Sequence, residues 1–222
     1  IDVNLPDNNG YTPLTWCCDK GDKSLNIANL LLKHKHIDVN LPDNNGYTPL
    51  TWCCYQGDKS LKVANLLLRH KDIKVNLPDN TWCDLTPLTR CCDKGDKSLG
   101  IAQRLLEHKH IKVNLPDNNG YTPLTRCCDK GDKSLGIAQR LLEHKHIKVN
   151  LPDNKGYTPL TKCCFWGDES LNIAKLLLRR RDIKVNLPDN KGLTPLTWCC
   201  KEGAKSLKVA NLLLEHKHIK VN

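Results

Sequence analysis

Residues 5–40 read LPDNNGYTPLTWCCDKGDKSLNIANLLLKHKHIDVN, and this stretch decides the fold because it recurs five more times in the 222-residue chain. The period is 36 residues, except in the third copy, which has 38. Self-similarity at a period of roughly 20–50 residues is typical of solenoid proteins. A unit this short cannot bury its apolar side chains alone, so neighbouring units must stack. We therefore predict a single solenoid over 1–222, with repeats at about 5–40, 41–76, 77–114, 115–150, 151–186 and 187–222, and with 1–4 as the end of a preceding repeat.

Each unit contains the signals for two short helices and one loop. Residues 7–10 (Asp-Asn-Asn-Gly) indicate a turn, because Asn and Gly tolerate a positive φ. Thr12 and Pro13 indicate a helix start, since Thr can cap a helix and Pro suits its first position. The helix is expected to end at the next glycine. Asp22 or Ser24 is then expected to cap a second helix, whose apolar side chains share one face.

Several motifs of the unit together resemble the ankyrin repeat. They are Gly-Tyr-Thr-Pro-Leu at 10–14, a small pair at 17–18, a glycine at 21, a Leu run at 30–32 and Val-Asn at 39–40. The resemblance implies an all-α repeat fold, an ankyrin-type solenoid of stacked helix-turn-helix units with hairpin-like loops. It covers the whole chain, because Thr-Pro-Leu recurs at 48–50, 86–88, 122–124, 158–160 and 194–196.

The unit also departs from the ankyrin pattern in three respects. The usual period of the family is about 33 residues. Cysteines replace its pair of small alanines, and a threonine replaces the histidine that follows Thr-Pro-Leu. We expect these changes to alter hydrogen bonding at the start of the first helix without altering the fold.

The chain contains 13 cysteines, twelve of them in adjacent pairs, one pair in each repeat. Equivalent cysteines of stacked repeats should lie about one helix diameter apart, roughly 10 Å. A disulfide needs Cα atoms within about 7 Å of each other. We therefore predict free thiols that act as small apolar side chains. Free thiols in this number favour a reducing, intracellular compartment.

A His-x-His pattern raises the question of a metal site, since histidine is a common ligand. The fifth repeat has Arg180 and Asp182 at these places, and a series that tolerates arginine is expected to be a solvated loop. The chain has no glycine-rich phosphate loop and no nucleophile elbow. Cys and His recur from repeat to repeat, whereas an active site would occur once. We therefore predict no metal, no cofactor and no enzyme activity. The pattern occurs at 34–36, 108–110, 144–146 and 216–218.

The copies differ mainly at the loop tip, at the residue before the Cys pair and at the two residues after it. Shared positions carry the stacking, so function is expected where the repeats differ. The resemblance implies that loop tips and the exposed side of the first helix line a concave groove that holds a protein partner. The partner-binding residues predicted in this way are Asn9, Tyr11, Trp16, Asn45, Tyr47, Trp52, Tyr55, Gln56, Trp82, Arg90, Tyr121, Arg126, Lys155, Tyr157, Lys162, Phe165, Trp166, Lys191 and Trp198.

The residue before the Cys pair is a tryptophan in three repeats and a basic residue in the other three. Arg90, Arg126 and Lys162 fill it in the middle repeats. Long basic side chains are almost never fully buried without a partner, so we expect this position to be partly exposed, tryptophans included. Interface hot spots favour Trp, Tyr and Arg, which agrees with that interpretation. The alternative is that each tryptophan packs across onto the next repeat.

The third repeat changes its own loop. Residues 80–86 read Asn-Thr-Trp-Cys-Asp-Leu-Thr, with two added residues and no glycine. We expect Trp82 and Cys83, the cysteine outside the six adjacent pairs, to point outward. The longer tip is either a contact loop or a tolerated surface insertion.

Three functions stay open at this point. The first is a non-catalytic protein-binding or scaffolding module, for which the net charge of +10 favours an acidic partner. The second is a structural array that stacks end to end into a filament, since no repeat looks like a distinct cap. The third is polyanion or nucleic-acid binding through a basic groove. Nucleic acid is disfavoured, because Asp19, Asp93 and Asp129 share that face and no recognised motif occurs. No stretch approaches the ~20 apolar residues of a membrane helix, so we predict no membrane span.

Overall fold

The computed structural model describes residues 2–220, and within them the chain forms only α-helices and short 3₁₀ turns. The all-α prediction is confirmed. Each repeat contributes a first α-helix, a 3₁₀ turn and a second α-helix. The first helices are α1 (Pro13–Lys20), α3 (Pro49–Gln56), α5 (Pro87–Lys94), α7 (Pro123–Lys130), α9 (Pro159–Trp166) and α11 (Pro195–Glu202). The second helices are α2 (Leu25–Leu31), α4 (Leu61–Leu68), α6 (Leu99–Leu106), α8 (Leu135–Glu143), α10 (Leu171–Leu178) and α12 (Leu207–Leu214).

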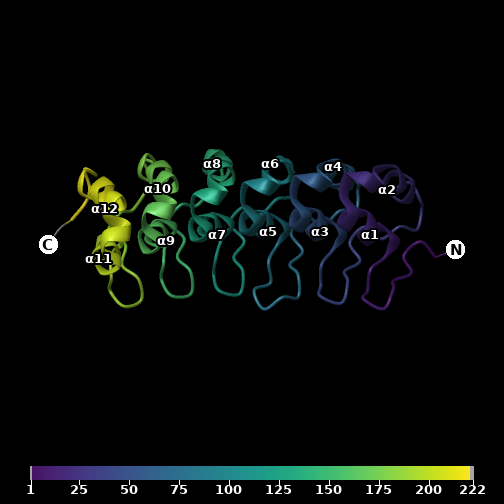
Figure 1. The fold of residues 1–222 in the computed structure, drawn as a ribbon, viewed down its shortest axis with the longest axis horizontal. Coiled ribbons are helices and arrows are strands. Elements are labelled where there is room, and N and C mark those ends of the chain that lie inside the picture. The colour runs from purple at the N-terminus through teal and green to yellow at the C-terminus, as the bar shows by residue number, and fades with distance from the viewer. Residues whose placement is uncertain (1, 221–222) are drawn as a thin grey trace. The chain divides into compact units, whose positions relative to one another are not determined.

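The helices gather in two compact units, Ile1–Lys112 and Val113–Asn222, and each is described by itself. In the first unit α1 packs on α3 and α3 on α5, while α2, α4 and α6 stack in the same order. In the second unit α7, α9 and α11 form one such row and α8, α10 and α12 the other. Within each unit the two rows make two layers, and the hairpin-like loops extend from the first-helix layer (Figure 1).

Each first helix begins with a threonine cap and a proline. The Thr12 hydroxyl oxygen accepts a hydrogen bond from the Thr15 N–H at 3.1 Å, and the two hydroxyl oxygens lie 3.0 Å apart. Pro13 occupies the first turn, where a missing N–H leaves no bond unmade. Thr15 is fully buried, so the threonine that replaces the family's histidine is an internal member of this cap.

The glycine that ends the first helix is required by space as well as by backbone conformation. Gly21 has a φ of +69°, which residues with a Cβ rarely adopt. A Cβ at this position would lie 2.6 Å from the carbonyl oxygen of Lys59 in the next repeat. The glycine therefore allows consecutive repeats to approach backbone to backbone.

Within a unit, the preceding repeat caps each second helix. The Asp22 carboxylate accepts hydrogen bonds from the backbone N–H groups of Lys62 (2.9 Å) and Val63 (3.3 Å) at the start of α4. The expectation that Asp22 or the following serine caps its own helix is therefore wrong, and that serine makes no side-chain cap. In the next repeat Ser60 instead donates its hydroxyl to the carbonyl oxygen of Cys18 at 3.0 Å. The carboxylates that serve α6, α10 and α12 in the same way are Asp58, Asp132 and Asp168.

The core consists of Leu, Ile, Val, Ala and Cys side chains, and all thirteen cysteines are free thiols, as predicted. The prediction considered equivalent cysteines, but the contact between repeats joins the second cysteine of one repeat to the first of the next, as Cys18 to Cys53. Burial raises the pKa of Cys53 well above its usual value, so the thiol stays protonated. The other contacts of this kind are Cys54–Cys91, Cys128–Cys163 and Cys164–Cys199.

Candidate functional site

One aspartate organises the hairpin-like loop of every repeat. In the second repeat one carboxylate oxygen of Asp43 accepts hydrogen bonds from the backbone N–H groups of Asn45 and Tyr47, both at 2.9 Å. The other oxygen accepts a bond from Trp52 Nε1 at 2.9 Å. Trp52 is the residue before the Cys pair on α3, so the carboxylate ties the loop to the first helix. We name this group the loop carboxylate; its members are Asp7, Asp43, Asp79, Asp117, Asp153 and Asp189.

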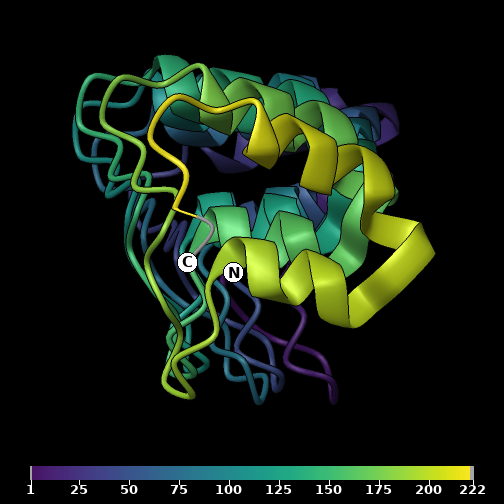
Figure 2. The same cartoon turned by 90° about the vertical axis from the view of Figure 1, so that its left-hand side faces the viewer.

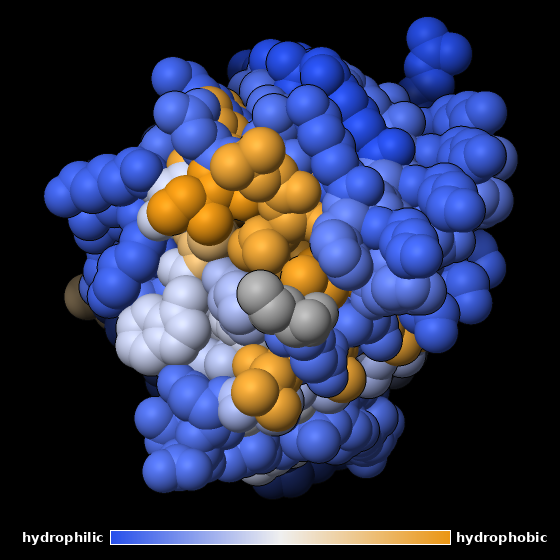
Figure 3. Space-filling view, turned by 90° about the vertical axis from the view of Figure 1, so that its right-hand side faces the viewer, coloured by the Kyte–Doolittle hydropathy of each residue, from blue (hydrophilic) through white to orange (hydrophobic). Residues whose placement is uncertain are grey.

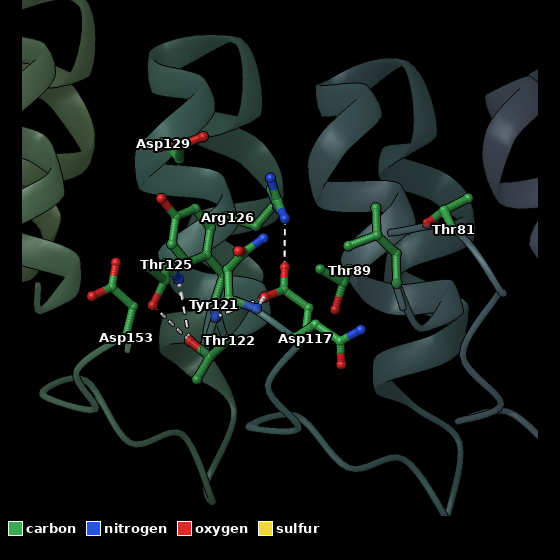
Figure 4. Close-up of polar contacts among 12 residues, drawn as sticks. Thr81, Thr89, Asp117, Tyr121, Thr122, Thr125, Arg126, Asp129 and Asp153 are labelled. Carbon is green, nitrogen blue, oxygen red and sulfur yellow. Dashed lines mark hydrogen bonds and ion pairs between the residues drawn. The ribbon is translucent and has the colours of Figure 1, made fainter. Parts of the chain in front are cut away.

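Basic side chains replace the tryptophan as the donor in the middle repeats. Arg126 forms an ion pair with the loop carboxylate of its repeat, Asp117 (Figure 4). Lys162 Nζ lies 3.7 Å from the Asp153 carboxylate. Tryptophan donates a hydrogen bond to the loop carboxylate, arginine forms a hydrogen-bonded ion pair with it, and lysine forms a longer ion pair without a hydrogen bond. The side chains that contact their loop carboxylate in these ways are Trp16, Trp52, Arg90, Arg126, Lys162 and Trp198.

Burial of these donors corrects the expectation that the position is partly exposed. That expectation is right for Trp16, which is 40% exposed. The loop carboxylate supplies the partner that a desolvated cation requires, which explains how arginine and lysine fit inside. The alternative of packing across repeats is nearer the structure, but the ring of Trp52 lies 5.2 Å from Tyr11 of the preceding repeat. Partial exposure is wrong for Trp52, Arg90, Arg126, Lys162 and Trp198, each 5–9% exposed.

Hydrogen bonds favour the ionised form of two loop carboxylates, Asp7 and Asp189. The bond from the Tyr11 N–H is the largest cause that lowers the pKa of Asp7, and the Trp16 indole adds to it. Burial is the largest single influence on Asp189 and raises its pKa. The bonds from the Leu193 N–H and the tryptophan indole of that repeat outweigh it, and the net pKa is lowered. A charged acceptor strengthens each bond that holds the loop.

Aromatic rings continue from one repeat to the next in the first unit. The ring centroid of Tyr11 lies 5.0 Å from that of Trp16 and 5.2 Å from that of Trp52. Tyr47 and Tyr55 lie 5.3 Å and 5.5 Å from Trp52. Of these rings Trp52 is buried, whereas Tyr55 is 38% exposed. We name these five rings the first aromatic row.

The second unit contains a comparable group of rings around a buried cation. Lys162 Nζ lies 4.3 Å from the ring of Tyr121 and 5.0 Å from that of Tyr157. Phe165 lies 5.4 Å from Trp166, which is 37% exposed and donates its indole N–H to Asp129 at 3.1 Å. We name this group the second aromatic row; its rings are Tyr121, Tyr157, Phe165, Trp166 and Trp198.

The remaining predicted site residues lie beside these rows. Gln56 is half-buried and donates its side-chain amide to Asp19 at 2.8 Å, which joins two first helices. The tyrosines of the rows other than Tyr55 are half-buried. The four loop-tip residues of the predicted set are exposed; they are Asn9, Asn45, Lys155 and Lys191.

The longer loop of the third repeat closes on its own loop carboxylate. Asp79 accepts hydrogen bonds from the backbone N–H groups of Thr81 (3.2 Å) and Leu85 (3.1 Å). Trp82 points outward as predicted and is 81% exposed. Cys83 is buried, so its predicted outward position is wrong. The carboxylate gathers the added residues into a turn, and that turn places the thiol inside.

A search for variation between the copies misses the loop carboxylates, because aspartate follows Leu-Pro in all six. That constancy was the available signal. An aspartate that is constant in every repeat, in a unit where another position varies among Trp, Arg and Lys, is consistent with one acceptor that several kinds of side chain can contact.

The His-x-His pairs lie on the surface, with the ring centroids of each pair 5.7–5.9 Å apart. Among residues 2–220, no three His, Cys, Asp or Glu side chains are grouped so as to hold a metal ion. In the same part of the chain no helix has the length and apolar character needed to cross a membrane.

The first repeat presents an apolar surface at the end of the first unit (Figure 3). Leu5, Ile27 and Leu30 are exposed there. Val63, which is equivalent to Ile27 in the next repeat, is fully buried. Stacking by another repeat is what covers this position inside the unit.

Comparison with known proteins gives the class of the chain. The family described as "Ankyrin repeats (3 copies)" matches residues 1–79, 77–153 and 133–222. The chain therefore belongs to the ankyrin repeat family, whose domains typically bind proteins and are generally non-catalytic.

Two solved structures have the same fold. The crystal structure of EF0377, an ankyrin repeat protein, matches with a TM-score of 0.79 and 18% identity over 97% of this chain and 99% of that one. An ankyrin repeat domain (ABAYE2397) from Acinetobacter baumannii AYE matches with a TM-score of 0.75 and 22% identity over 91% of this chain and 96% of that one. A search of the curated proteins finds no match.

Proposed function

We propose that the chain is a non-catalytic protein-binding or scaffolding module whose partner contacts the loop tips and the two aromatic rows. The observation that carries this proposal is that the side chains of Tyr55 and Trp166 are partly exposed, while contacts with neighbouring rings already hold them in place. Aromatic side chains supply large contact areas in interfaces. Rings fixed before binding lose little conformational freedom when a partner arrives.

Polar groups also hold the rings of Tyr55 and Trp166, which we call the two anchors, in place. Lys94 Nζ lies 3.7 Å from the ring centroid of Tyr55. The Trp166 indole is held by its hydrogen bond to Asp129. Each anchor therefore presents one ring surface outward while its other contacts stay within the protein.

The proposed contact surface is narrower than the set predicted from the sequence. Arg90, Arg126 and Lys162 are buried against loop carboxylates, so they support the face from beneath. The exposed lysines at the tips of the fifth and sixth repeats, Lys155 and Lys191, favour an acidic partner on the second unit.

Selection from a random peptide library against the full chain tests this proposal. Enriched peptides should bind Tyr55→Ala or Trp166→Ala at least about tenfold more weakly than the parent chain, a loss of about 1.4 kcal/mol. Lys59→Ala and Lys133→Ala remove exposed side chains from the 3₁₀ turns and should leave affinity unchanged. Peptides that bind both aromatic variants as tightly as the parent chain would place the partner site elsewhere.

End-to-end stacking into a filament has less support. A junction between copies would set the sixth repeat against the apolar end surface of the first. At the place of Asp22 the sixth repeat has Ala204, so it offers no carboxylate to cap the second helix of the next copy. Light scattering across protein concentration measures this, and we expect no growth in mass.

A further inference from the structure

Six short segments carry nearly all of the excess positive charge of the chain. We name them the joints, since each links a second helix to the following loop. Nine of the ten net positive charges and all nine histidines lie in them, while the rest of the chain has a net charge of +1. The joints are residues 33–38, 69–74, 107–112, 143–148, 179–184 and 215–220.

Asparagine side chains fix the joints in place. Asn40 donates its side-chain amide to the carbonyl oxygen of Asp72 and accepts a bond from the Lys74 N–H, both at 2.8 Å. Asn150 binds the joint of the fifth repeat in the same way, at 2.7 Å and 2.9 Å. Within each unit the joints therefore lie in register along one edge, between the second helices and the hairpin-like loops (Figure 2). Equivalent bonds are made by Asn4, Asn76, Asn114 and Asn186.

Most of the positive charges of the joints are not neutralised by neighbouring side chains. The joint lysines are exposed and form no ion pair within residues 2–220. Arg180 is the joint arginine that pairs with a carboxylate, that of Asp182, while Glu107 and Glu143 pair with arginines of their own helices. Within each unit the joint edge is thus a row of solvent-exposed cations on a fixed backbone.

We propose that the joint edge binds a linear, phosphate-bearing polyanion, a second surface separate from the aromatic rows. A row of unpaired cations binds such a polymer by releasing its condensed counterions, which needs no base or side-chain readout. The joint of the fifth repeat has the highest charge, with Arg179 and Arg181 exposed beside Lys184. The planar fork of arginine suits phosphate oxygens.

The composition of the joints narrows the class of ligand. They contain no Trp, Tyr or Phe on which single-stranded bases could stack. Their isoleucines are buried or half-buried, so no apolar side chain is available to enter a lipid surface. Several cations within each six-residue joint match a polymer of high charge density better than an acidic peptide, which carries at most one charge per residue.

Inorganic polyphosphate is the probe, titrated into the full chain over a range of salt concentrations. We expect binding at low salt whose logarithm falls linearly with the logarithm of salt concentration. The triple variant Arg179→Gln, Arg181→Gln, Lys184→Gln should bind at least about tenfold more weakly and with a shallower salt slope. All three side chains are exposed. The hydrogen bond that Lys184 makes to Asn150 comes from its backbone N–H, which the substitution leaves in place, so the fold should be kept.

The matched control removes the same charge elsewhere. Lys59→Gln, Lys97→Gln, Lys133→Gln takes three exposed lysines from the 3₁₀ turns and should change affinity less than about threefold. Equal losses in the two triple variants would overturn the proposal, since net charge alone would then explain binding. Equal affinity for poly-glutamate of the same total charge, or no binding of polyphosphate by the parent chain, would overturn it as well.

Discussion

Within each unit, the loop face, which consists of the hairpin-like loops and their loop carboxylates, uses charge in the opposite way to the joint edge. On the loop face each loop carboxylate contacts the side chain before the Cys pair of its own repeat, and even Arg90 and Lys162 are buried there. On the joint edge the lysines are exposed without an ion pair inside residues 2–220. Compensated charge on the loop face fixes the backbone, whereas uncompensated charge on the joint edge is available to a ligand.

The comparison also changes what variation between the copies means. The residue before the Cys pair varies among Trp, Arg and Lys, yet each of the three contacts the loop carboxylate of its own repeat. Variation at this position therefore exchanges one side chain that contacts the loop carboxylate for another. Variation at exposed positions, such as Tyr55 and Trp166, is the kind that can select a partner.

Removal of a loop carboxylate should have the largest effect. Asp117→Ala takes the acceptor from Arg126 and from the backbone N–H groups of Asn119 and Tyr121. It removes the carboxylate that forms an ion pair with a buried cation, and we expect a loss of about 3–5 kcal/mol in the free energy of unfolding. Equilibrium denaturation with urea measures it. A loss below about 1 kcal/mol would show that the carboxylate does not hold the loop.

Exchange of one donor for another should have a much smaller effect. Arg90→Trp installs the donor that the second repeat uses, and it removes Arg90 Nε, which is buried without a hydrogen-bond partner. We expect a change within about 1.5 kcal/mol in the free energy of unfolding. Arg90→Leu, which cannot donate, is the matched control and should lose about 3–5 kcal/mol. Equal losses for the two variants would mean that the donors are not interchangeable.

The cap between repeats should contribute about 1 kcal/mol. Asp58→Ala removes the carboxylate that accepts from Gly100 N–H and Ile101 N–H at the start of α6. The converse change, Ala204→Asp, adds a carboxylate at the exposed equivalent position of the sixth repeat and should change stability by less than about 0.5 kcal/mol. Both are measured by thermal unfolding, and equal effects would argue against capping across the repeat interface.

The joint histidines should give the smallest effect. Burial, followed by the neighbouring His110 and Lys109, lowers the pKa of His108 from 6.5, and His144 and His216 behave alike. The unfolded chain then binds protons first as the pH falls, so the free energy of unfolding should be constant above about pH 7 and decrease below 6.5. Denaturation at pH 7.5 and 5.5 measures it, with His108→Gln expected to reduce the difference. A chain that becomes more stable at pH 5.5 would contradict the sign.

The repeat period and the turn and cap signals predicted the fold well, because each short unit repeats the same local signals. The chemistry between repeats was less predictable. The trans cap by Asp22 and the burial of Arg126 both depend on which groups stacking brings within hydrogen-bond distance. A local pattern assigns Asp22 to its own helix, and general burial preferences place an arginine outside. Neither the local pattern nor the burial preference says which hydrogen-bond or ion-pair partner the adjacent loop or repeat supplies.

The central claim is that the side chain before the Cys pair and the loop carboxylate of the same repeat act together to hold the loop. A double-mutant cycle with Asp117→Ala, Arg126→Leu and the double variant, followed by urea denaturation, tests it most directly. We predict a coupling energy of about 2–3 kcal/mol, so the loss in the double variant should be smaller than the sum of the two single losses by that amount. A coupling near zero, with the two single losses adding in full, would contradict the account.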